Sequence, residues 1–333
     1  MLDPRARARF ARNRSAVAGA TIVGVLVTFA LVGPLLARHD PFESDFAAGI
    51  SRDLLPVGPG KAFPLGADRL FRDVLARLAY AGRLSLAIAV AATLLATAIG
   101  AVTGIVAGYY EGRRVRVPWA ASAGAAAALA ALAMGRPLVA LLSILAGTLC
   151  ALVRRSPAIA LDLDGILMRF VDVLLAFPFL LLVMSIGAAL QHTSAVTIFV
   201  TLGATGWLGI ARVLRAKTLQ VRSLEYVVAS RALGQSTPSL LRKHILPNIA
   251  GPLVVSATVL VAQMIVADSV LSYLGAGIAP PTPTWGRMLF EGQDYVIAAP
   301  WLVAAPGTAI LLAVWGFNML GEGLRDALDP HDG

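Results

Sequence analysis

Long runs of apolar residues, separated by polar connectors, make up most of this 333-residue chain. Such runs suit membrane helices when they approach the roughly 20 residues with which a helix crosses about 30 Å of hydrocarbon. In chain order, six of them cover about 16–37, 84–108, 166–190, 195–212, 250–274 and 300–320. The pattern predicts an all-α, polytopic membrane protein with six core transmembrane helices.

A further apolar region, 118–153, is extremely rich in alanine and leucine, and Gly135, Arg136 and Pro137 break it near the middle. Each arm is near the lower length limit for crossing a bilayer. Because arginines flank both ends, we expect both ends in the cytoplasm and an extra helical hairpin between them. A single alanine-rich stretch that lies on the membrane surface, or is partly disordered, is the alternative.

Polar segments predict the organisation around the spans. The run Ala16–Ala37 exceeds the 7–15 apolar residues of a signal peptide, so we expect an uncleaved first helix. Further on, Asp68–Leu78 places Leu70, Val74 and Leu78 on one face and predicts a short interfacial helix. The predicted bounds are 1–14 for a basic cytoplasmic N-terminus, 15–37 for the first helix, 38–83 for an external segment, 84–320 for the membrane core and 321–333 for a cytoplasmic tail.

Composition and charge fit a membrane protein. Charged residues make up 14% of the chain, against about 25% in soluble proteins. The net charge of +9 fits basic cytoplasmic loops better than nucleic acid, because no soluble basic domain is left to bind it. With the N-terminus inside, 19 of the 28 Lys and Arg residues fall on the cytoplasmic side, although arginines near 69–83 oppose this orientation. The single Cys150 excludes an intrachain disulfide, and four scattered histidines predict no metal site.

The polar connector 212–252 has helix signals of its own. They are Ser223 and Thr237 as N-caps, Pro238 in a first helical turn, Gly234 as a helix end and Pro247 as the return toward the membrane. A helix–Gly–helix unit beside a membrane core is suited to a mechanical contact, because a partner can grip a short helix as a rigid body.

This connector resembles the EAA loop of ABC importer permeases, in which an EAA element is followed after three positions by Gly and later by Leu-Pro. The corresponding residues here are Val228-Ala229-Ser230, Gly234 and Leu246-Pro247, so that valine replaces the acid. Glu225-Tyr226 also matches the dipeptide/oligopeptide/nickel permease group. The resemblance implies that the loop 213–249 couples the chain to an ATPase through Glu225, Ala229, Arg231, Ala232, Gly234, His244, Leu246 and Pro247.

Similar motifs occur in order along the chain, except over about 112–162. They are Pro64–Val74, Met168–Pro178, Leu271–Gly275, Pro280–Gly286 and Gly321–Pro330. The chain therefore resembles the C-type permeases of binding-protein-dependent peptide importers. The resemblance implies a type I ABC importer permease fold with six core helices, to which the hairpin 118–153 is added.

The resemblance also implies a transport role and its partners. We expect a subunit of the bacterial inner membrane with both termini cytoplasmic, a homologous permease as its heterodimer partner, two ABC ATPase subunits and an external substrate-binding protein. No Gly-x-x-x-x-Gly-Lys-Ser/Thr motif is present, so we expect no enzyme activity and no bound cofactor, with ATP and Mg on the partner subunits. Di- or oligopeptides are the expected cargo, and nickel, glutathione or another small solute is the alternative. A secondary transporter is a remote alternative, because the spans contain one clear carboxylate and no obvious repeat.

Three residues within the apolar regions have competing interpretations. Asp268 lies in a predicted span, where it either lines the translocation pathway and meets a substrate amino group or makes a structural hydrogen bond to a neighbouring helix. Pro178 is expected either to kink its helix, which would help a gate bend, or to serve packing alone. Trp285, in an external loop, is expected to contact the binding protein or to anchor the chain at the membrane interface.

Overall fold

The computed structural model describes residues 4–51, 53–112, 114–118, 158–190 and 194–328, together with single positions between 124 and 146. Two compact units are present, one formed by Met1–Ile105 with Leu174–Gly333 and the other by Val106–Val173.

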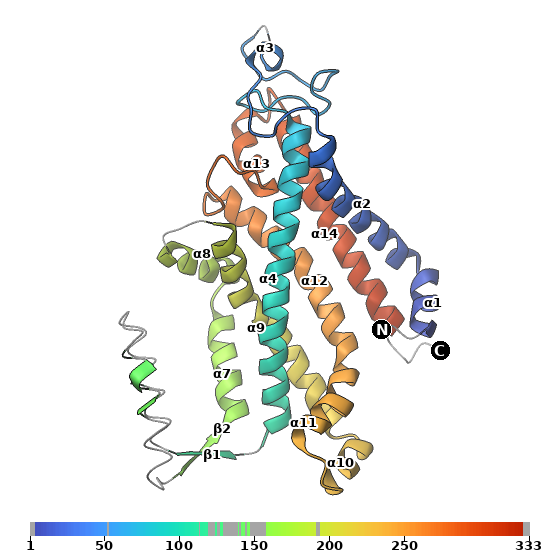
Figure 1. Ribbon diagram of the computed structural model, residues 1–333, viewed down its shortest axis with the longest axis vertical. Helices are drawn as coiled ribbons and strands as arrows, with labels where there is room; N and C mark the ends of the chain where they lie inside the picture. The colour runs from blue at the N-terminus through green and yellow to red at the C-terminus, as the bar shows by residue number, and fades with distance from the viewer. Residues whose placement is uncertain are drawn as a thin grey trace. The chain divides into compact units, whose positions relative to one another are not determined.

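The first half of the chain contains α1 (Pro4–Arg12), α2 (Arg14–Leu36), α3 (Phe46–Gly49), α4 (Val74–Tyr110), β1 (Arg114–Pro118), β2 (Ala158–Asp162) and α7 (Leu163–Ala176). The second half contains α8 (Phe179–Leu190), α9 (Ala195–Arg222), α10 (Glu225–Ala232), α11 (Thr237–Leu240), a π-helical turn η1 (Leu241–Ile245), α12 (Leu246–Tyr273), α13 (Trp285–Gly292), η2 (Gln293–Tyr295) and α14 (Trp301–Leu328) (Figure 1). The all-α class is confirmed, apart from one short pair of strands.

Five helices of the described residues are long and apolar enough to cross a membrane. They are Arg14–Leu35, Val74–Tyr110, Ala195–Arg222, Thr237–Tyr273 and Trp301–Leu328, and the pair α7 and α8 counts as a sixth if it forms one broken span. The predicted span 166–190 is therefore wrong as a continuous helix. The helix stops before Pro178, whose ring lacks an N–H group and clashes with the preceding turn, so the expected kink at Pro178 is confirmed as a bend between two helices.

The start of α4 differs from the sequence-based expectation. Asp68–Leu78 is not a separate interfacial helix, because α4 begins at Val74 and continues without a break to Tyr110. The Asp73 carboxylate accepts hydrogen bonds from the backbone N–H groups of Leu75 and Ala76, at 2.8 and 3.4 Å. A carboxylate at this position satisfies the first free N–H groups of a helix, so Asp73 sets the helix start.

Small residues bring α2 and α14 close together in the first unit. A Cβ atom added at Gly19 would lie 2.6 Å from the backbone nitrogen of Leu320, and one added at Gly323 would overlap Ala16. Helices in lipid associate through such close contacts, because apolar side chains gain little from leaving hydrocarbon. The two helices run antiparallel, since Asn13 before α2 donates to Asp326 near the end of α14 at 2.8 Å.

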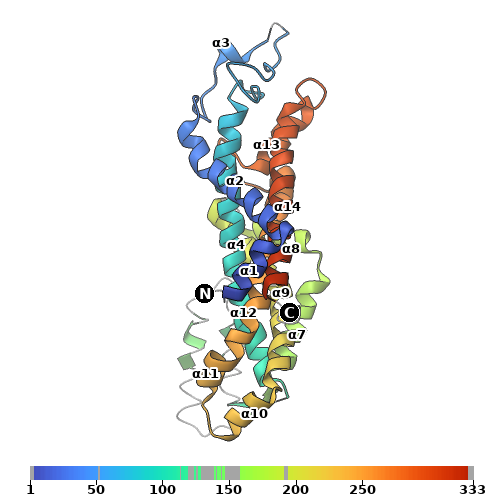
Figure 2. The ribbon, with the colours of Figure 1, turned by 90° about the vertical axis from the view of Figure 1, so that its right-hand side faces the viewer.

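The other long helices of the first unit follow a consistent up-and-down course (Figures 1 and 2). An added Cβ at Gly203 of α9 would touch Leu95, and one at Gly104 of α4 would touch Ala211, so α4 and α9 run side by side in the same direction. Gly251, near the start of α12, lies against Leu328 at the end of α14. The starts of α2 and α12 and the end of α14 therefore share one side, which we call the α10 end. The starts of α4 and α14 lie toward the opposite, α13 end.

Buried charges hold the α13 end together. Arg72 and Arg77 have only 5% and 1% of their surface exposed. Arg72 Nη2 lies 2.7 Å from Asp68 Oδ2, and Arg77 Nη2 lies 3.1 Å from Glu291 Oε2 on α13. These are two of the arginines that opposed the predicted orientation. Because they are paired with carboxylates in the interior, they do not act as free loop charges.

The second unit contains the flanks of the alanine-rich region. Strands β1 and β2 pair antiparallel, with Arg114 opposite Asp162 and Pro118 opposite Ala158. The sequence does alternate apolar and polar residues at Arg114-Val115-Arg116-Val117, which is a strand signal that the membrane pattern hid. Most of the predicted hairpin 118–153 lies outside the described residues, so the hairpin stays a prediction. The pairing brings the two ends of that region together, as a hairpin requires.

Candidate functional site

The connector between α9 and α12 forms a compact helical hairpin, α10–α11, at one end of the first unit (Figure 1). Its first helix begins one residue later than Ser223 suggested. Ser223 caps the end of α9, where its hydroxyl donates to Gln220 O at 2.9 Å, and Leu224 occupies the N-cap of α10. The expectation that Ser223 caps α10 is therefore wrong. Glu225 lies in the first turn of α10, where its negative charge complements the helix dipole.

Gly234 ends α10, as the sequence predicts. Its φ angle is +83°, in the left-handed region that favours glycine. Gln235 N donates to Ser230 O at 3.2 Å, which is the bond that closes a Schellman motif and satisfies a terminal carbonyl group. Within the described part of the chain, no atom lies within 4 Å of a Cβ added at Gly234. The requirement for glycine is thus conformational rather than steric.

The second half of the hairpin is continuous with the membrane core. Pro238 lies in the first turn of α11 as predicted, but the N-cap is Ser236 rather than Thr237. From Thr237 to Tyr273 the chain forms a single 37-residue helix that includes the π-helical turn η1. Pro247 lies in the first turn of α12, as the expected return toward the membrane requires, but the helix that returns already begins at Thr237, and the π-helical turn ends two residues before Pro247. A π-helical turn changes the hydrogen-bond register, which accommodates the missing N–H group of a proline.

A polar network joins α10 to the start of α12. Asn248 Nδ2 donates to the Tyr226 hydroxyl at 3.1 Å and to His244 O at 2.6 Å. The His244 ring bonds through Nε2 to Gln235 Oε1 at 3.1 Å, and Gln235 Nε2 donates to Ser239 Oγ at 2.8 Å. The rings of Tyr226 and His244 are also in contact, with centroids 5.8 Å apart. The hairpin is thereby fixed to α12 as one body.

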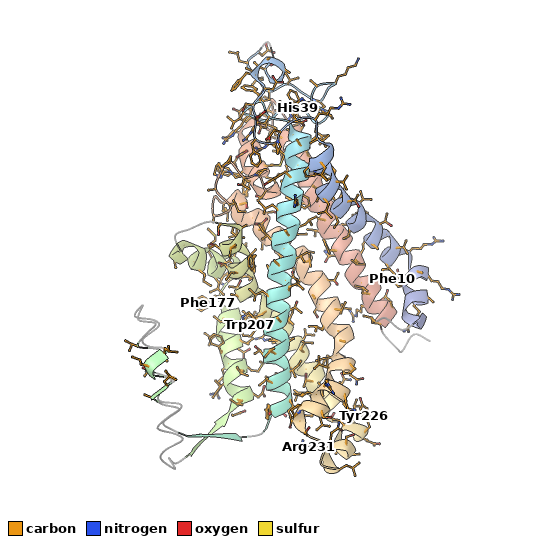
Figure 3. All side chains as sticks on the ribbon, in the orientation of Figure 1. Phe10, His39, Phe177, Trp207, Tyr226 and Arg231 are labelled. Atoms are coloured by element: carbon orange, nitrogen blue, oxygen red, sulfur yellow. The ribbon has the colours of Figure 1, made fainter. Side chains whose placement is uncertain are left out.

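The hairpin presents an accessible surface that contains apolar side chains. Val227, Leu240 and Ile245 are buried and hold it together. Val228 is exposed, and Leu233 at the tip is 88% exposed. Figure 3 shows Tyr226 and Arg231 at this end, far along the first unit from His39. An exposed apolar tip beside basic groups is suited to binding another protein.

The structure places the predicted coupling residues in the α10–α11 hairpin and in the adjoining η1 turn and first residues of α12. Those with exposed side chains or backbone are Glu225, Ala229, Arg231, Ala232, Gly234, Leu246 and Pro247, and His244 is half-buried. Their role in coupling stays a prediction. Gln235 and Asn248 complete the network and were not predicted from the sequence as site residues. The only signal for them was the presence of two amide side chains within a segment that had to pack against itself.

Asp268 does not belong to this hairpin. It is fully buried on α12, and neither of its side-chain oxygens has a hydrogen-bond partner among the described residues. The expected structural hydrogen bond to a neighbouring helix is therefore not found among the described residues, and the pathway interpretation stays untested. Trp285 is also fully buried, and its Nε1 donates to Leu78 O at 3.2 Å. Trp285 is therefore packed inside the protein and is not an interfacial anchor, whereas the expected contact of the loop 275–299 with a binding protein stays a prediction.

Comparison with known proteins agrees with this architecture. The family model described as "Binding-protein-dependent transport system inner membrane component" matches residues 143–331, and that of the "N-terminal TM domain of oligopeptide transport permease C" matches residues 5–56. The chain belongs to the family of binding-protein-dependent inner membrane transport components. Its fold is the type I ABC importer permease fold of that family.

Three relatives show how far along the chain the sequence similarity to this family extends. It is 33% identical to the dipeptide transport system permease protein DppC of Bacillus subtilis, over 97% of this chain and 83% of that protein. It is 31% identical to the oligopeptide transport system permease protein OppC of Salmonella typhimurium, over 98% and 90%. It is 32% identical to the glutathione transport system permease protein GsiD of Pectobacterium atrosepticum, over 97% and 89%. The similarity thus extends over nearly the whole transport component.

Proposed function

We propose that this chain is the membrane-spanning subunit of an ATP-driven importer of di- and oligopeptides, and that it forms half of the translocation pathway. The observation that carries the proposal is the α10–α11 hairpin, which is exposed at its tip and rigidly continuous with α12. The relatives named for dipeptide and oligopeptide transport support the cargo. A relative named for glutathione transport supports the alternative of glutathione, which is itself a small peptide.

The partners follow from the same proposal. A homologous permease completes the pathway as a heterodimer, two ABC ATPase subunits carry ATP and Mg, and an external binding protein delivers the cargo. The chain itself performs no hydrolysis. The hairpin and both termini face the cytoplasm, which agrees with the shared position of the starts of α2 and α12 and the end of α14.

In this proposal, the hairpin binds an ATPase subunit and transmits the movement of that subunit to the membrane core. Val228 replaces the expected acid, so docking relies on the shape of α10, on the exposed Leu233, and on Glu225 and Arg231. When the ATPase subunits close on ATP, they displace the hairpin, and α12 moves with it because α11 and α12 belong to one helix and Tyr226 of α10 is bonded to Asn248 of α12. The transport cycle is then a shift between two states of the membrane core that the ATPase and the cargo bias together.

Uptake by the reconstituted complex tests the function. Proteoliposomes that contain this chain with its partner permease, ATPase subunits and binding protein are expected to accumulate labelled di- or tripeptides only when ATP is supplied. Glutathione and nickel ions serve as competing cargoes in the same assay. ATP-independent accumulation driven by an ion gradient would contradict the proposal and favour a secondary transporter.

Labelling with a membrane-impermeant maleimide tests the orientation. Leu54 and Leu233 are 80% and 88% exposed, so cysteines placed at these two positions should be similarly accessible to the reagent. Both variants carry serine in place of Cys150, so that the introduced cysteine is the only thiol in the sequence. We expect Leu54→Cys to react in intact spheroplasts. Leu233→Cys is expected to react only in permeabilised membranes from which peripheral subunits have been stripped. The opposite pattern would place the hairpin outside and exclude ATPase docking.

A further inference from the structure

The polar segment before α4 carries exposed apolar side chains at the α13 end of the first unit. Phe46, on α3, is 63% exposed, and Leu54, in the loop that follows α3, is 80% exposed. Figures 1 and 2 show α3 beyond the start of α4, on the side away from the α10–α11 hairpin. Single apolar side chains are common on protein surfaces, and exposure alone does not indicate a binding surface. The conformation of this segment and its charge distinguish it from such positions.

Leu54 lies at the tip of a closed loop. Its φ angle is +60°, in the left-handed region that L-residues other than glycine rarely adopt. Two backbone hydrogen bonds close the loop, from Leu54 N to Ser51 O at 3.1 Å and from Ser51 N to Leu55 O at 2.8 Å. The backbone pairing of Ile50 with Pro56 closes its base. The loop therefore holds an apolar side chain in solvent at a position where glycine would be free of strain.

Phe71, in the turn before α4, holds α3 in place. Its φ angle is +61°, and its carbonyl oxygen accepts a hydrogen bond from Asp45 N at 3.0 Å. The ring centroids of Phe71 and Phe46 are 5.5 Å apart. A Cβ added at Gly49 would lie 2.6 Å from the Phe71 Cβ, so α3 packs closely against this residue. Phe46 is thus supported on one side by a second aromatic ring.

The whole segment is fixed to the helices of the membrane core. Trp301 Nε1, at the start of α14, donates to Ala67 O at 3.1 Å. The His39 ring bonds through Nδ1 to Asp73 Oδ2 at 2.8 Å, and Figure 3 shows His39 at this end of the first unit. These bonds hold both ends of the segment. A partner that binds Phe46 and Leu54 therefore loses little affinity to the ordering of the segment.

The charge of the segment indicates what kind of partner it binds. Residues 39–60 contain four acids against the single basic residue Arg52, which gives a formal charge of −3 in a chain of net charge +9. The acids are Asp40, Glu43, Asp45 and Asp53. Anionic lipid headgroups repel such a segment, and segments that lie on a membrane are rich in Lys and Arg instead. The charge therefore favours a protein with basic groups over the lipid surface.

We propose that Phe46 and Leu54 belong to the surface on which the external binding protein docks. The inference rests on the proposed function, which places the α13 end outside the cell membrane and supplies the binding protein as a partner. The partner presents apolar groups to Phe46 and Leu54, and basic side chains to the exposed Asp40, Glu43 and Asp53. Because the segment is bonded to α4 and α14, docking there places the binding protein at a defined position on the membrane core.

The concentration of binding protein that half-saturates uptake tests this surface in the reconstituted importer. The purified binding protein of the complex, loaded with a tripeptide, is titrated against proteoliposomes that contain ATP. Leu54→Asn removes the apolar side chain but keeps a residue that tolerates a positive φ angle. We expect it to raise the half-saturating concentration about tenfold, the effect of losing one apolar anchor of an interface, at an unchanged maximal rate. Phe46→Ser is expected to act in the same direction.

Two controls separate contact from structure. Leu35 is 81% exposed, but it lies in the last turn of the membrane span α2, so Leu35→Asn should leave the half-saturating concentration unchanged. Saturating binding protein is expected to slow the maleimide labelling of Leu54→Cys. A purely structural role of Leu54 would produce no such protection.

Neutralising the acids distinguishes a protein partner from the membrane. Asp40→Asn/Glu43→Gln/Asp53→Asn removes three negative charges and leaves Asp45, which caps α3, in place. We expect a half-saturating concentration about tenfold higher at low salt and a weaker dependence on salt, in vesicles with and without phosphatidylglycerol. A shift that appears only with phosphatidylglycerol would assign the segment to the membrane surface and overturn the inference.

The inference and the proposed function fail in different ways. An unchanged half-saturating concentration in both Leu54→Asn and Phe46→Ser, beside normal uptake by the native importer, would overturn the inference alone. Variants that only lower the amount of assembled complex, with native half-saturation in what remains, would also overturn it. If the native complex shows no ATP-dependent uptake with its binding protein, the proposed function falls and this inference falls with it.

Discussion

Substitution of Gly234 by valine is expected to lower peptide uptake and binding-protein-stimulated ATPase activity to about a tenth of the native level or less. The φ angle of Gly234 is +83°, and an L-residue in this region costs roughly 1–2 kcal/mol, with more for a β-branched side chain. Since about 1.4 kcal/mol corresponds to a tenfold change, the docking conformation of α10 becomes a minor state. Uptake and ATPase activity are measured in proteoliposomes, and an immunoblot records the amount of permease in the membrane.

Two matched variants identify the cause of the expected loss. Gly234→Asn should retain most of the activity, because asparagine tolerates the left-handed region. Gly112 has a φ angle of +72° and, like Gly234, open space around an added Cβ in the described structure. Gly112→Val therefore imposes similar backbone strain outside the α10–α11 segment and is expected to leave coupling intact. Normal coupling in Gly234→Val would remove the hairpin from the transport mechanism.

The sequence identified features that depend on local chemistry. Lipid requires every backbone group to be satisfied within a helix, so five of the six predicted spans fall on single long helices, and the sixth, 166–190, falls on the bent pair α7 and α8. Gly234 and Pro238 were predicted correctly because a positive φ angle and a missing N–H group restrict the chain wherever they occur. Such restrictions act within a few residues and need no knowledge of the tertiary structure.

Features that depend on distant neighbours were missed. Trp285 looks like an interfacial anchor in the sequence, but it packs against Gly82, more than 200 positions earlier in the chain. The N-caps at Ser223 and Thr237 were wrong by about one residue, since several small polar residues compete at each helix end. The π-helical turn before Pro247 likewise has no local signal beyond the proline itself.

The arginines near 69–83 show how tertiary structure changes the meaning of a charge count. Counted as loop charges, they oppose an orientation with the N-terminus inside. Arg77 Nη1 donates to Pro41 O at 3.2 Å while Nη2 contacts Glu291, so this side chain joins the polar segment before α4 to α13. The sequence contained both partners, but no local pattern connects Arg77 with a carboxylate on α13.

Glu291→Gln is expected to lower the free energy of unfolding of the assembled permease by about 3–5 kcal/mol, the cost of removing one partner from a buried ion pair. Its Oε2 atom lies 3.1 Å from Arg77 and 3.4 Å from Arg72, and its Oε1 atom lies 3.1 Å from Arg287. Without the Glu291 charge, Asp68 is the only carboxylate of the described residues that is paired with Arg72 and Arg77. Because typical stabilities are about 5–15 kcal/mol, we expect a clear fall in the thermal unfolding temperature of the purified complex.

Neighbouring variants determine whether unpaired charge causes the Glu291→Gln loss. Asp294→Asn removes an exposed acid three residues away and should change the free energy of unfolding by no more than about 0.5 kcal/mol. Arg287 is the most accessible of the three guanidinium groups that contact Glu291 within 3.5 Å. In Arg287→Gln/Glu291→Gln one excess cation is removed, so the double variant should be less destabilised than the sum of the single variants. Additive losses would show that Glu291 stabilises this end through packing, and that the arginines are satisfied without its charge.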